Sequence, residues 1–400
     1  MHSVIDRPGA LVSEPMPGFS GRDMLCFSHD WTGDPLSKTH LMRVLSRDNR
    51  VLWINSIGYR TPSLNKADMG RAFGKLAALR NRLREVEPNI FVLSPIAIPA
   101  YGSAAVRRLN RRLLKWQVES AMRRLAFRKP INWVFNPAAA VVAGTLAEEA
   151  VIYYCVDEYS AFSGVNAGQL EELERQLIDR SDAVIVSAEE LLKTKAPHHS
   201  RTVLVRHGVD FDHFRKAVAP ETAIAEEIRS LPRPIIGFFG LIADWVDIDL
   251  MAAAARRWPQ GTVAVLGKAT TDVSSLAALP NVKLFGRKPY ADLPAYCKGF
   301  DVALNPFRIN RLTLNANPLK VREYLAAGLP VVSTAIPEVE ALGLCRIAST
   351  EEEFLAEIEA ALADPGPSLA RSETMRQESW QARVAAIAGH LRNFGILNDE

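Results

Sequence analysis

The sequence contains few cysteines and no long apolar run. Its four cysteines, Cys26, Cys155, Cys297 and Cys345, lie far apart in the 400 residues and form no CxxC pair, so neither a structural zinc site nor a disulfide framework is expected. No segment reaches the roughly 18 uninterrupted apolar residues that a bilayer span requires. Residues 1–18 carry acids and prolines where a secretory signal would have an apolar core. We therefore expect a cytoplasmic protein that is soluble or peripheral to a membrane.

Two familiar nucleotide-binding motifs are also missing. The absence of GxGxxG argues against a nicotinamide dehydrogenase. Gly261, Gly267 and Lys268 are spaced one residue too widely for a P-loop, and the residues between the glycines form a predicted strand that leaves no loop for a phosphate. Asp247 and Asp249 are better explained as a solvated helix face than as a metal-binding DxD motif. We expect no metal and no resident cofactor.

What the sequence does contain is the composition and alternation of a globular α/β protein. Hydrophobic residues make up 48% and charged residues 23%, enough for two cores. Short β-branched runs alternate with helical patterns, which predicts parallel sheets. The predicted strands form two series: 24–28, 50–56, 89–94, 131–136, 150–156, 183–188 and 202–208, then 234–240, 262–267, 281–286, 301–307, 330–334 and 345–349. The Pro-rich segment between the series predicts domains at 1–215 and 216–375, followed by a helix over 376–400 that could pack back on the first domain.

The overall charge of +3 hides a strongly basic stretch. Between Arg71 and Lys129 there are fourteen basic and three acidic residues, a net charge of +11, which leaves −8 for the rest of the chain. The basic residues are Arg71, Lys75, Arg80, Arg82, Arg84, Arg107, Arg108, Arg111, Arg112, Lys115, Arg123, Arg124, Arg128 and Lys129. This asymmetry suggests an anionic partner for one face of the first domain.

Part of this stretch predicts a basic amphipathic helix. Leu109, Leu113 and Trp116 recur at helical spacing, and Arg107, Arg108, Arg111 and Arg112 fall on other sides. One interpretation is contact with an anionic membrane, with Trp116 at the interface. The alternative is an ordinary surface helix whose apolar stripe packs in the domain core. Nucleic acid is a poor candidate partner, because no recognised binding motif is present.

The most informative segment is NANPLKVREYLAAGLPVVST, residues 315–334. Pro318 ends a loop, residues 319–327 are predicted helical, and Gly328 caps the helix. Lys320 and Glu323 share a face at the end where the helix dipole is positive, so Lys320 and the free N–H groups could bind a diphosphate while Glu323 accepts from sugar hydroxyls. The alternative is a common solvated Lys–Glu pair.

This segment resembles the donor-binding helix of GT-B glycosyltransferases, and the resemblance extends along most of the chain. HGVDFDHF (207–214) resembles the hinge-proximal motif of that superfamily, and FFGLIADWVDIDL (238–250) resembles the glycine-rich first turn of its donor domain. VKLFGRKPYADLPAYCKGFDVALNPF (282–307) is similar to its nucleobase-contacting stretch. SHDWTGDPLSKTHLMRVLS (28–46) resembles the first strand and loop of the xanthan-type glucuronosyltransferases. The implied fold is GT-B: two Rossmann-like domains, acceptor-binding and then nucleotide-sugar-binding, facing a cleft.

The sequence departs from the family-four pattern in two places. Asn315 stands where retaining members have the first Glu of an E-x7-E pair. Ala243, Asp244 and Trp245 stand where those members have an Arg and a Lys. One half of the usual diphosphate clamp is therefore missing, and Lys320 would carry more of that charge.

The resemblance also implies roles for single residues. Asp157, at the end of a predicted strand, resembles a general base, although a carboxylate there could instead cap the next turn, and Glu158 and Asp30 are rivals. His29 is expected beside it. The donor-binding residues implied are Gly240, Arg287, Asn317, Lys320 and Glu323, and those on the acceptor side are Asp30, His40 and His207.

We therefore expect an enzyme that moves a sugar from a nucleotide diphosphate sugar, with UDP favoured, to a polysaccharide or lipid-linked oligosaccharide. The resemblance is to bacterial exopolysaccharide and teichuronic-acid glycosyltransferases. A nucleotide-sugar epimerase of the same architecture would turn over its donor without an acceptor. A catalytically inactive glycan-binding module would bind glycan without any transfer.

Overall fold

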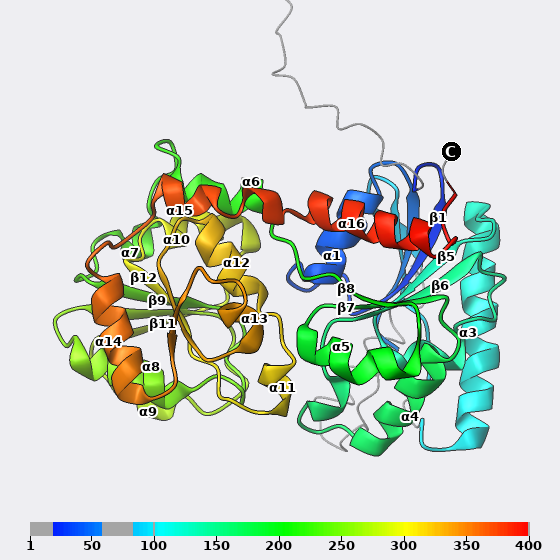
Figure 1. Ribbon diagram of the computed structural model, residues 1–400, viewed down its shortest axis with the longest axis horizontal. Helices are drawn as coiled ribbons and strands as arrows, with labels where there is room; N and C mark the ends of the chain where they lie inside the picture. Colours follow the sequence, from blue (N-terminus) through cyan, green and yellow to red (C-terminus); the bar gives the residue numbers. More distant parts are fainter. Residues whose placement is uncertain (1–18, 58–82, 99–100, 399–400) are drawn as a thin grey trace, which may run out of the picture.

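The computed structural model describes residues 19–57, 83–98 and 101–398, which form two α/β domains side by side (Figure 1). The first sheet has the order β3-β4-β2-β1-β5-β6-β7-β8, and the second has the order β11-β10-β9-β12-β13-β14. All neighbouring strands pair in parallel except β3 and β4. The prediction of an α/β fold with two parallel sheets is confirmed.

The strands of the first sheet are β1 (Asp23–Phe27), β2 (Arg50–Ile54), β3 (Leu83–Glu87), β4 (Ile90–Leu93), β5 (Ile131–Val134), β6 (Ala150–Cys155), β7 (Ala183–Val186) and β8 (Thr202–Leu204). Those of the second are β9 (Ile235–Phe239), β10 (Thr262–Leu266), β11 (Val282–Gly286), β12 (Val302–Asn305), β13 (Val331–Thr334) and β14 (Arg346–Ala348). Sequence analysis missed β3, a charged and largely solvent-facing edge strand without the apolar run of an inner strand.

The helices of the first domain are α1 (Ser37–Leu45), α3 (Ala104–Leu125), α4 (Ala167–Ile178) and α5 (Glu189–Lys195). The second domain contains α6 (Phe211–Phe214), α7 (Glu226–Arg229), α8 (Ile248–Arg257), α9 (Ser274–Ala277), α10 (Leu293–Cys297), α11 (Arg311–Leu314), α12 (Leu319–Ala326), α13 (Pro337–Glu340), α14 (Glu351–Ala361) and α15 (Leu369–Glu373). The last helix, α16 (Trp380–Asn393), follows them.

Both faces of the first sheet are buried. On β1, Leu25 and Phe27 point into the cluster that also contains residues of α3 and α4, whereas Met24 and Cys26 point into the cluster shared with α1 and α16. Because helices cover both faces, every residue of the inner strands can be apolar, which explains their continuous hydrophobic runs.

Helix α16 belongs to the second half of the sequence but packs on the first domain. Figure 1 shows it running from the second domain across to the first. Its Trp380 is buried and stacks on His40 of α1, with ring centroids 5.8 Å apart. The chain therefore passes between the domains twice, at residues 205–210 and 376–380, which we call the crossing segments. They are hydrogen bonded to each other, since the Val209 N–H donates to the Glu378 carbonyl over 2.8 Å.

The basic helix α3 lies at the outer end of the first domain, far from the second (Figure 1). Its buried face contains Asn110, Leu114, Gln117, Val118, Ala121 and Met122. Two residues of the predicted stripe face solvent instead, Leu109 at 51% and Trp116 at 61% exposed, whereas Leu113 is half-buried. The alternative that these two side chains pack in the core is therefore excluded. Arg71, Lys75, Arg80 and Arg82, like the predicted non-signal segment 1–18, lie outside the described residues.

Candidate active site between the domains

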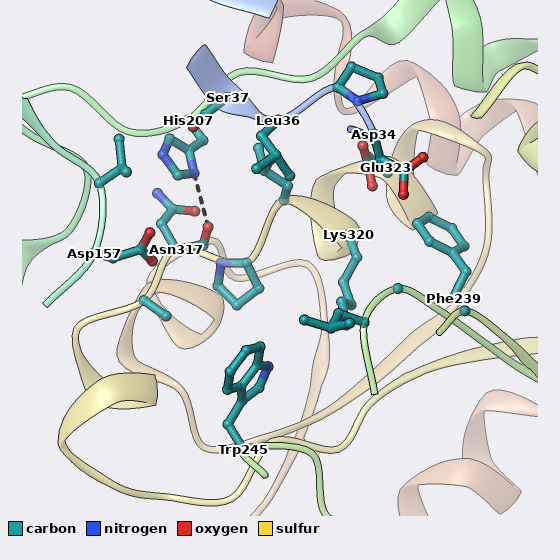
Figure 2. Close-up of a pocket in the computed structure, with 18 of the residues that line it drawn as sticks. Asp34, Leu36, Ser37, Asp157, His207, Phe239, Trp245, Asn317, Lys320 and Glu323 are labelled. Carbon is teal, nitrogen blue, oxygen red and sulfur yellow. Dashed lines mark hydrogen bonds between the residues drawn. The ribbon is translucent and has the colours of Figure 1, made fainter. Parts of the chain in front are cut away.

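A cavity of about 450 Å³ lies between the two domains. Its lining comes from the carboxyl ends of strands in both sheets: Val156 and Asp157 follow β6, Gly240 follows β9 and Gly267 follows β10. Parallel α/β sheets bind ligands at this edge. The loop before α1 and the first turn of α12 form two further walls, and Figure 2 shows residues of both.

Two glycines bring the ends of β9 and β10 unusually close together. Gly240 and Gly267 both have positive φ angles, of 129° and 147°. A Cβ on Gly267 would lie 1.8 Å from the Gly240 carbonyl oxygen, and a Cβ on Gly240 would lie 2.9 Å from the Lys320 ammonium nitrogen. Only glycine fits both positions, so the backbone itself forms this wall of the cavity.

Lys320 stands in the first turn of α12 and makes no ion pair with any residue in the described part of the chain. Its ammonium lies 4.2 Å from the ring centroid of Phe238 and 4.8 Å from that of Phe307, so two aromatic faces hold it. Burial lowers the pKa of Lys320 to about 7, against the opposing effect of Glu323. No side chain caps α12 at Pro318 and no acid lies in its first turn. This end of the cavity therefore offers N–H groups and a cation to an anion.

Glu323 is buried one turn further along α12. It is 9% exposed, forms no salt bridge with Lys320 and makes no side-chain hydrogen bond within the described part of the chain. Burial raises the pKa of Glu323 to about 8, and Lys320 only partly offsets the rise. Lys320 and Glu323 therefore do not form the solvated Lys–Glu surface pair that the sequence also allowed.

Asp157 lines the opposite side of the cavity, directly after β6. Among the residues that the structure describes, its half-buried carboxylate makes no hydrogen bond and the turn that follows has no side-chain cap, so no capping role is seen there. Burial raises its pKa to about 6, and the nearby Lys38 ammonium opposes the rise. The structure thus places a desolvated carboxyl group at the edge of the cavity that the first domain forms.

Lys38 is a charged cavity residue that sequence analysis missed. It is the second residue of α1, and burial lowers its pKa while Asp157 raises it. Like α12, α1 has no side-chain cap and no acid in its first turn. The signal was available in the sequence, since Lys320 was identified from the same position in its helix.

His207 and Asn317 connect the two domains behind the cavity. The His207 Nδ1 lies 3.0 Å from the Asn317 carbonyl oxygen, the dashed line in Figure 2, and must donate to it because a carbonyl only accepts. Burial lowers the pKa of His207 to about 3, so the ring is neutral and its Nε2 has no partner. The Asn317 side-chain amide donates to the Ser187 carbonyl over 2.8 Å. Both residues line the cavity and hold its walls together.

Arg287 reaches the cavity mouth but is already paired. It forms a 2.6 Å salt bridge with Asp34 of the other domain, and both side chains are about half exposed. A donor could contact Arg287 only at the edge of the site.

Three predicted residues lie outside the cavity lining. The His29 ring packs edge-on against Trp53, 5.2 Å away. Asp30 is exposed and accepts a hydrogen bond from the Ser56 N–H. His40 is buried against Trp380 and lies 4.0 Å from Asp210. None of the three lines the described cavity: the first two belong to the loop after β1, and His40 packs between α1 and α16.

No metal cluster accompanies this site in the described ranges, where no three His, Cys, Asp or Glu side chains are grouped so as to hold an ion. Nor does any helix in those ranges combine the length and apolarity needed to cross a membrane.

Because Glu323 is buried, we expect the free energy of unfolding to depend on pH. Its folded pKa of about 8 lies above the ordinary 4.5, so between these values the folded state holds the proton more tightly than the unfolded state. Wild-type stability should fall as pH rises through this window, and Glu323→Gln removes that loss. We expect no difference in the free energy of unfolding at pH 4.5 and an advantage of about 2–4 kcal/mol for Glu323→Gln at pH 8.

Chemical denaturation at several pH values measures this difference. Glu340→Gln, at an exposed position on α13, is the matched control and should track wild type throughout. A pH-independent difference for Glu323→Gln would mean that the carboxylate is not desolvated.

Comparison with known proteins agrees with the geometry. Residues 233–364 match the family described as Glycosyl transferases group 1. A segment of 222 residues is 28% identical to TuaH of Bacillus subtilis, which is named as a teichuronic acid biosynthesis glycosyltransferase. The matched segment covers 51% of this chain and 55% of TuaH, so the chain spans about half the length of this relative.

Solved structures resemble the whole fold. Sucrose-phosphate synthase from Thermosynechococcus elongatus superposes with a TM-score of 0.67 at 15% identity, covering 93% of this chain and 98% of its own. HepE from Anabaena, in complex with UDP-glucose, superposes with a TM-score of 0.58 at 13% identity, covering 94% of this chain and 96% of its own. The chain therefore has the GT-B fold of these structures, and its residues 233–364 match the glycosyl transferases group 1 family.

Proposed function

We propose that this protein transfers a sugar from a nucleotide diphosphate sugar, with UDP favoured, to a hydroxyl of a polysaccharide or lipid-linked oligosaccharide. One observation carries the proposal: a single cavity joins an unpaired cation at a helix start, on one domain, to a carboxyl group without hydrogen bonds on the other. The likeness to HepE with bound UDP-glucose and the name of TuaH support this substrate class.

The donor would bind along α12. Its diphosphate would meet the Lys320 ammonium and the uncapped N–H groups of the first turn, where the wall made by Gly240 and Gly267 has no side chains to obstruct it. Glu323, when ionised, would accept from the sugar hydroxyls of the nucleotide. The nucleotide sugar is a co-substrate here, and we expect no resident cofactor.

The acceptor would approach from the first domain. In a single displacement, the acceptor oxygen forms a bond to the anomeric carbon as the bond from that carbon to the phosphate oxygen breaks. The acceptor proton passes to Asp157, and Lys320 stabilises the charge left on the departing diphosphate. Lys38, close enough to oppose the raised pKa of Asp157, would keep that base ionised near neutral pH.

Asp157→Asn tests this assignment. With a nucleotide sugar and an acceptor, turnover should fall by about 10²-fold to 10⁴-fold because the proton acceptor is gone, whereas nucleotide affinity and Tm should stay close to wild type. Wild-type turnover should decrease as pH falls through about 6, where the Asp157 carboxylate becomes protonated. Product formation, followed by nucleotide release, gives both measurements.

Asp30→Asn is the control, since Asp30 is an exposed carboxylate outside the cavity. If Asp157→Asn retains wild-type turnover, Asp157 is not the base. Donor consumption without an acceptor would instead favour the epimerase alternative.

We also propose that the first domain rests on the inner face of the plasma membrane through α3. The outward side of this helix combines exposed Leu109 and Trp116 with exposed Arg108, Arg111 and Arg112. Basic residues attract anionic lipid headgroups, and a Trp ring inserts at the interface. A lipid-linked acceptor would explain this arrangement, because docking on the bilayer brings its headgroup to the protein.

Vesicle sedimentation tests the membrane proposal. Each Lys or Arg near an anionic surface contributes about 1 kcal/mol, screened by salt. Changing Arg108, Arg111 and Arg112 together to Gln should release the protein from vesicles containing phosphatidylglycerol, and Trp116→Ala should remove the binding that persists at high salt. Arg107 stays unchanged, because its guanidinium donates to the Tyr101 carbonyl within the domain.

The control is a set of neutral vesicles, which should retain little protein. If wild type fails to sediment with anionic vesicles even at low salt, α3 is not a membrane surface.

A further inference from the structure

A buried charge cluster lies in the first domain, directly beside Asp157. It consists of Glu158, Glu174 and Lys195, which are 3%, 5% and 7% exposed. The Lys195 ammonium lies 2.7 Å from the Glu174 carboxylate and 3.4 Å from that of Glu158. Neither carboxylate is left without hydrogen bonds: Tyr153 donates to Glu174, and Ser160 donates to Glu158, each over 2.5 Å.

The charges of this cluster do not balance within its own domain. Two carboxylates face one ammonium, so the first domain alone buries a net charge of −1. A buried charge that lacks a partner is strongly unfavourable, even where its hydrogen bonds are made.

The missing cation comes from the second domain. Arg311, the first residue of α11, places its guanidinium 3.5 Å from the Glu158 carboxylate and 3.2 Å from that of Glu171 on α4. Although burial alone would raise the pKa of Glu158, Lys195, Ser160 and Arg311 together hold it below its ordinary value.

The contact between Arg311 and Glu158 lies far from the segments that connect the domains. The two crossing segments lie along one side of the molecule, and α11 meets the first domain on the opposite side (Figure 1). A rotation about the crossing segments would therefore separate Arg311 from Glu158 first. A second cavity, of about 420 Å³, already borders this contact and is lined by Lys195, Glu158 and Arg311.

Other contacts between the domains lack this combination. Asp34 and Arg287 are both about half exposed, so water and salt screen their attraction, whereas the exposed Arg311 meets a carboxylate, that of Glu158, which is only 3% exposed. Arg206 pairs with buried Glu338, but Arg206 belongs to a crossing segment and would keep this partner when the domains rotate.

We propose that Arg311 is an electrostatic latch that neutralises the buried cluster only when the domains are closed, and that closure thereby fixes Asp157 for catalysis. The link to Asp157 is covalent: Glu158 is its neighbour in the chain, and Ser160, which donates to Glu158, follows in the same turn. Arg311 is thus a positioning residue that acts through Glu158. The catalytic half of this inference rests on the proposed function, and the closure half does not.

The test compares Arg311→Gln with Arg308→Gln. Arg308, three residues earlier, reaches only Asp247 and Asp249 of its own domain, so it is a matched control for loss of an arginine. Spin labels on Asp179→Cys and Ser275→Cys, both exposed, would report the separation of the two domains in a Cys345→Ser background, since the remaining cysteines are buried.

We expect Arg311→Gln to shift the distance distribution towards longer separations and to lower kcat about tenfold, whereas Arg308→Gln should match wild type in both. In a Glu158→Gln background the cluster is neutral without Arg311, so Arg311→Gln should then have little further effect on the distances. An unchanged distance distribution in Arg311→Gln overturns the latch. A shifted distribution with unchanged kcat overturns its role in positioning Asp157. If wild type shows no turnover, the proposed function fails while the distance measurement still decides the latch.

Discussion

Helix α12 buries two ionisable side chains of opposite charge, Lys320 and Glu323, without pairing them with each other, and the proposed donor site depends on this arrangement. Lys320 is held by aromatic faces and Glu323 is buried without a hydrogen bond, and the pKa of each is displaced in the direction that disfavours its charge. A protein gains nothing in stability from this arrangement. A bound ligand would supply the missing partners. A nucleotide diphosphate offers phosphate oxygens to the Lys320 ammonium and ribose hydroxyls to the Glu323 carboxylate.

The rest of the structure places a second set of groups opposite this helix. Parallel strands in both sheets end at the same cavity, so Asp157 and Lys38 of the first domain face α12 of the second. The crossing segments and α16 connect the domains on one side, and Arg311 closes the other. The outward face of α3 lies apart from these groups, at the far end of the first domain, where it leaves the cavity unobstructed.

Much of this could be predicted from the sequence, for reasons that particular residues make clear. Continuous apolar strands and the spacing of Lys320 and Glu323 follow local rules, so the fold class and this helix could be anticipated. Gly240, Asn317 and Asp157, which also line the cavity, were implied by the resemblance to GT-B glycosyltransferases. His40 could not, because its partner Trp380 is 340 residues away and only packing brings them together. β3 lacked an apolar run, and Arg311 is unremarkable until the structure sets it beside a buried carboxylate of the other domain.

Calorimetric titration of UDP into wild type, Lys320→Ala and Glu323→Ala tests whether the cavity beside α12 binds the donor nucleotide. The experiment requires neither the acceptor nor the identity of the sugar. Loss of a charged hydrogen bond to the ligand should cost about 1.5–3 kcal/mol, so each variant should bind UDP at least tenfold more weakly than wild type. Arg308→Gln, which lies outside the cavity, should bind as wild type does. If both α12 variants bind UDP with wild-type affinity, the cavity between the domains is not the donor site.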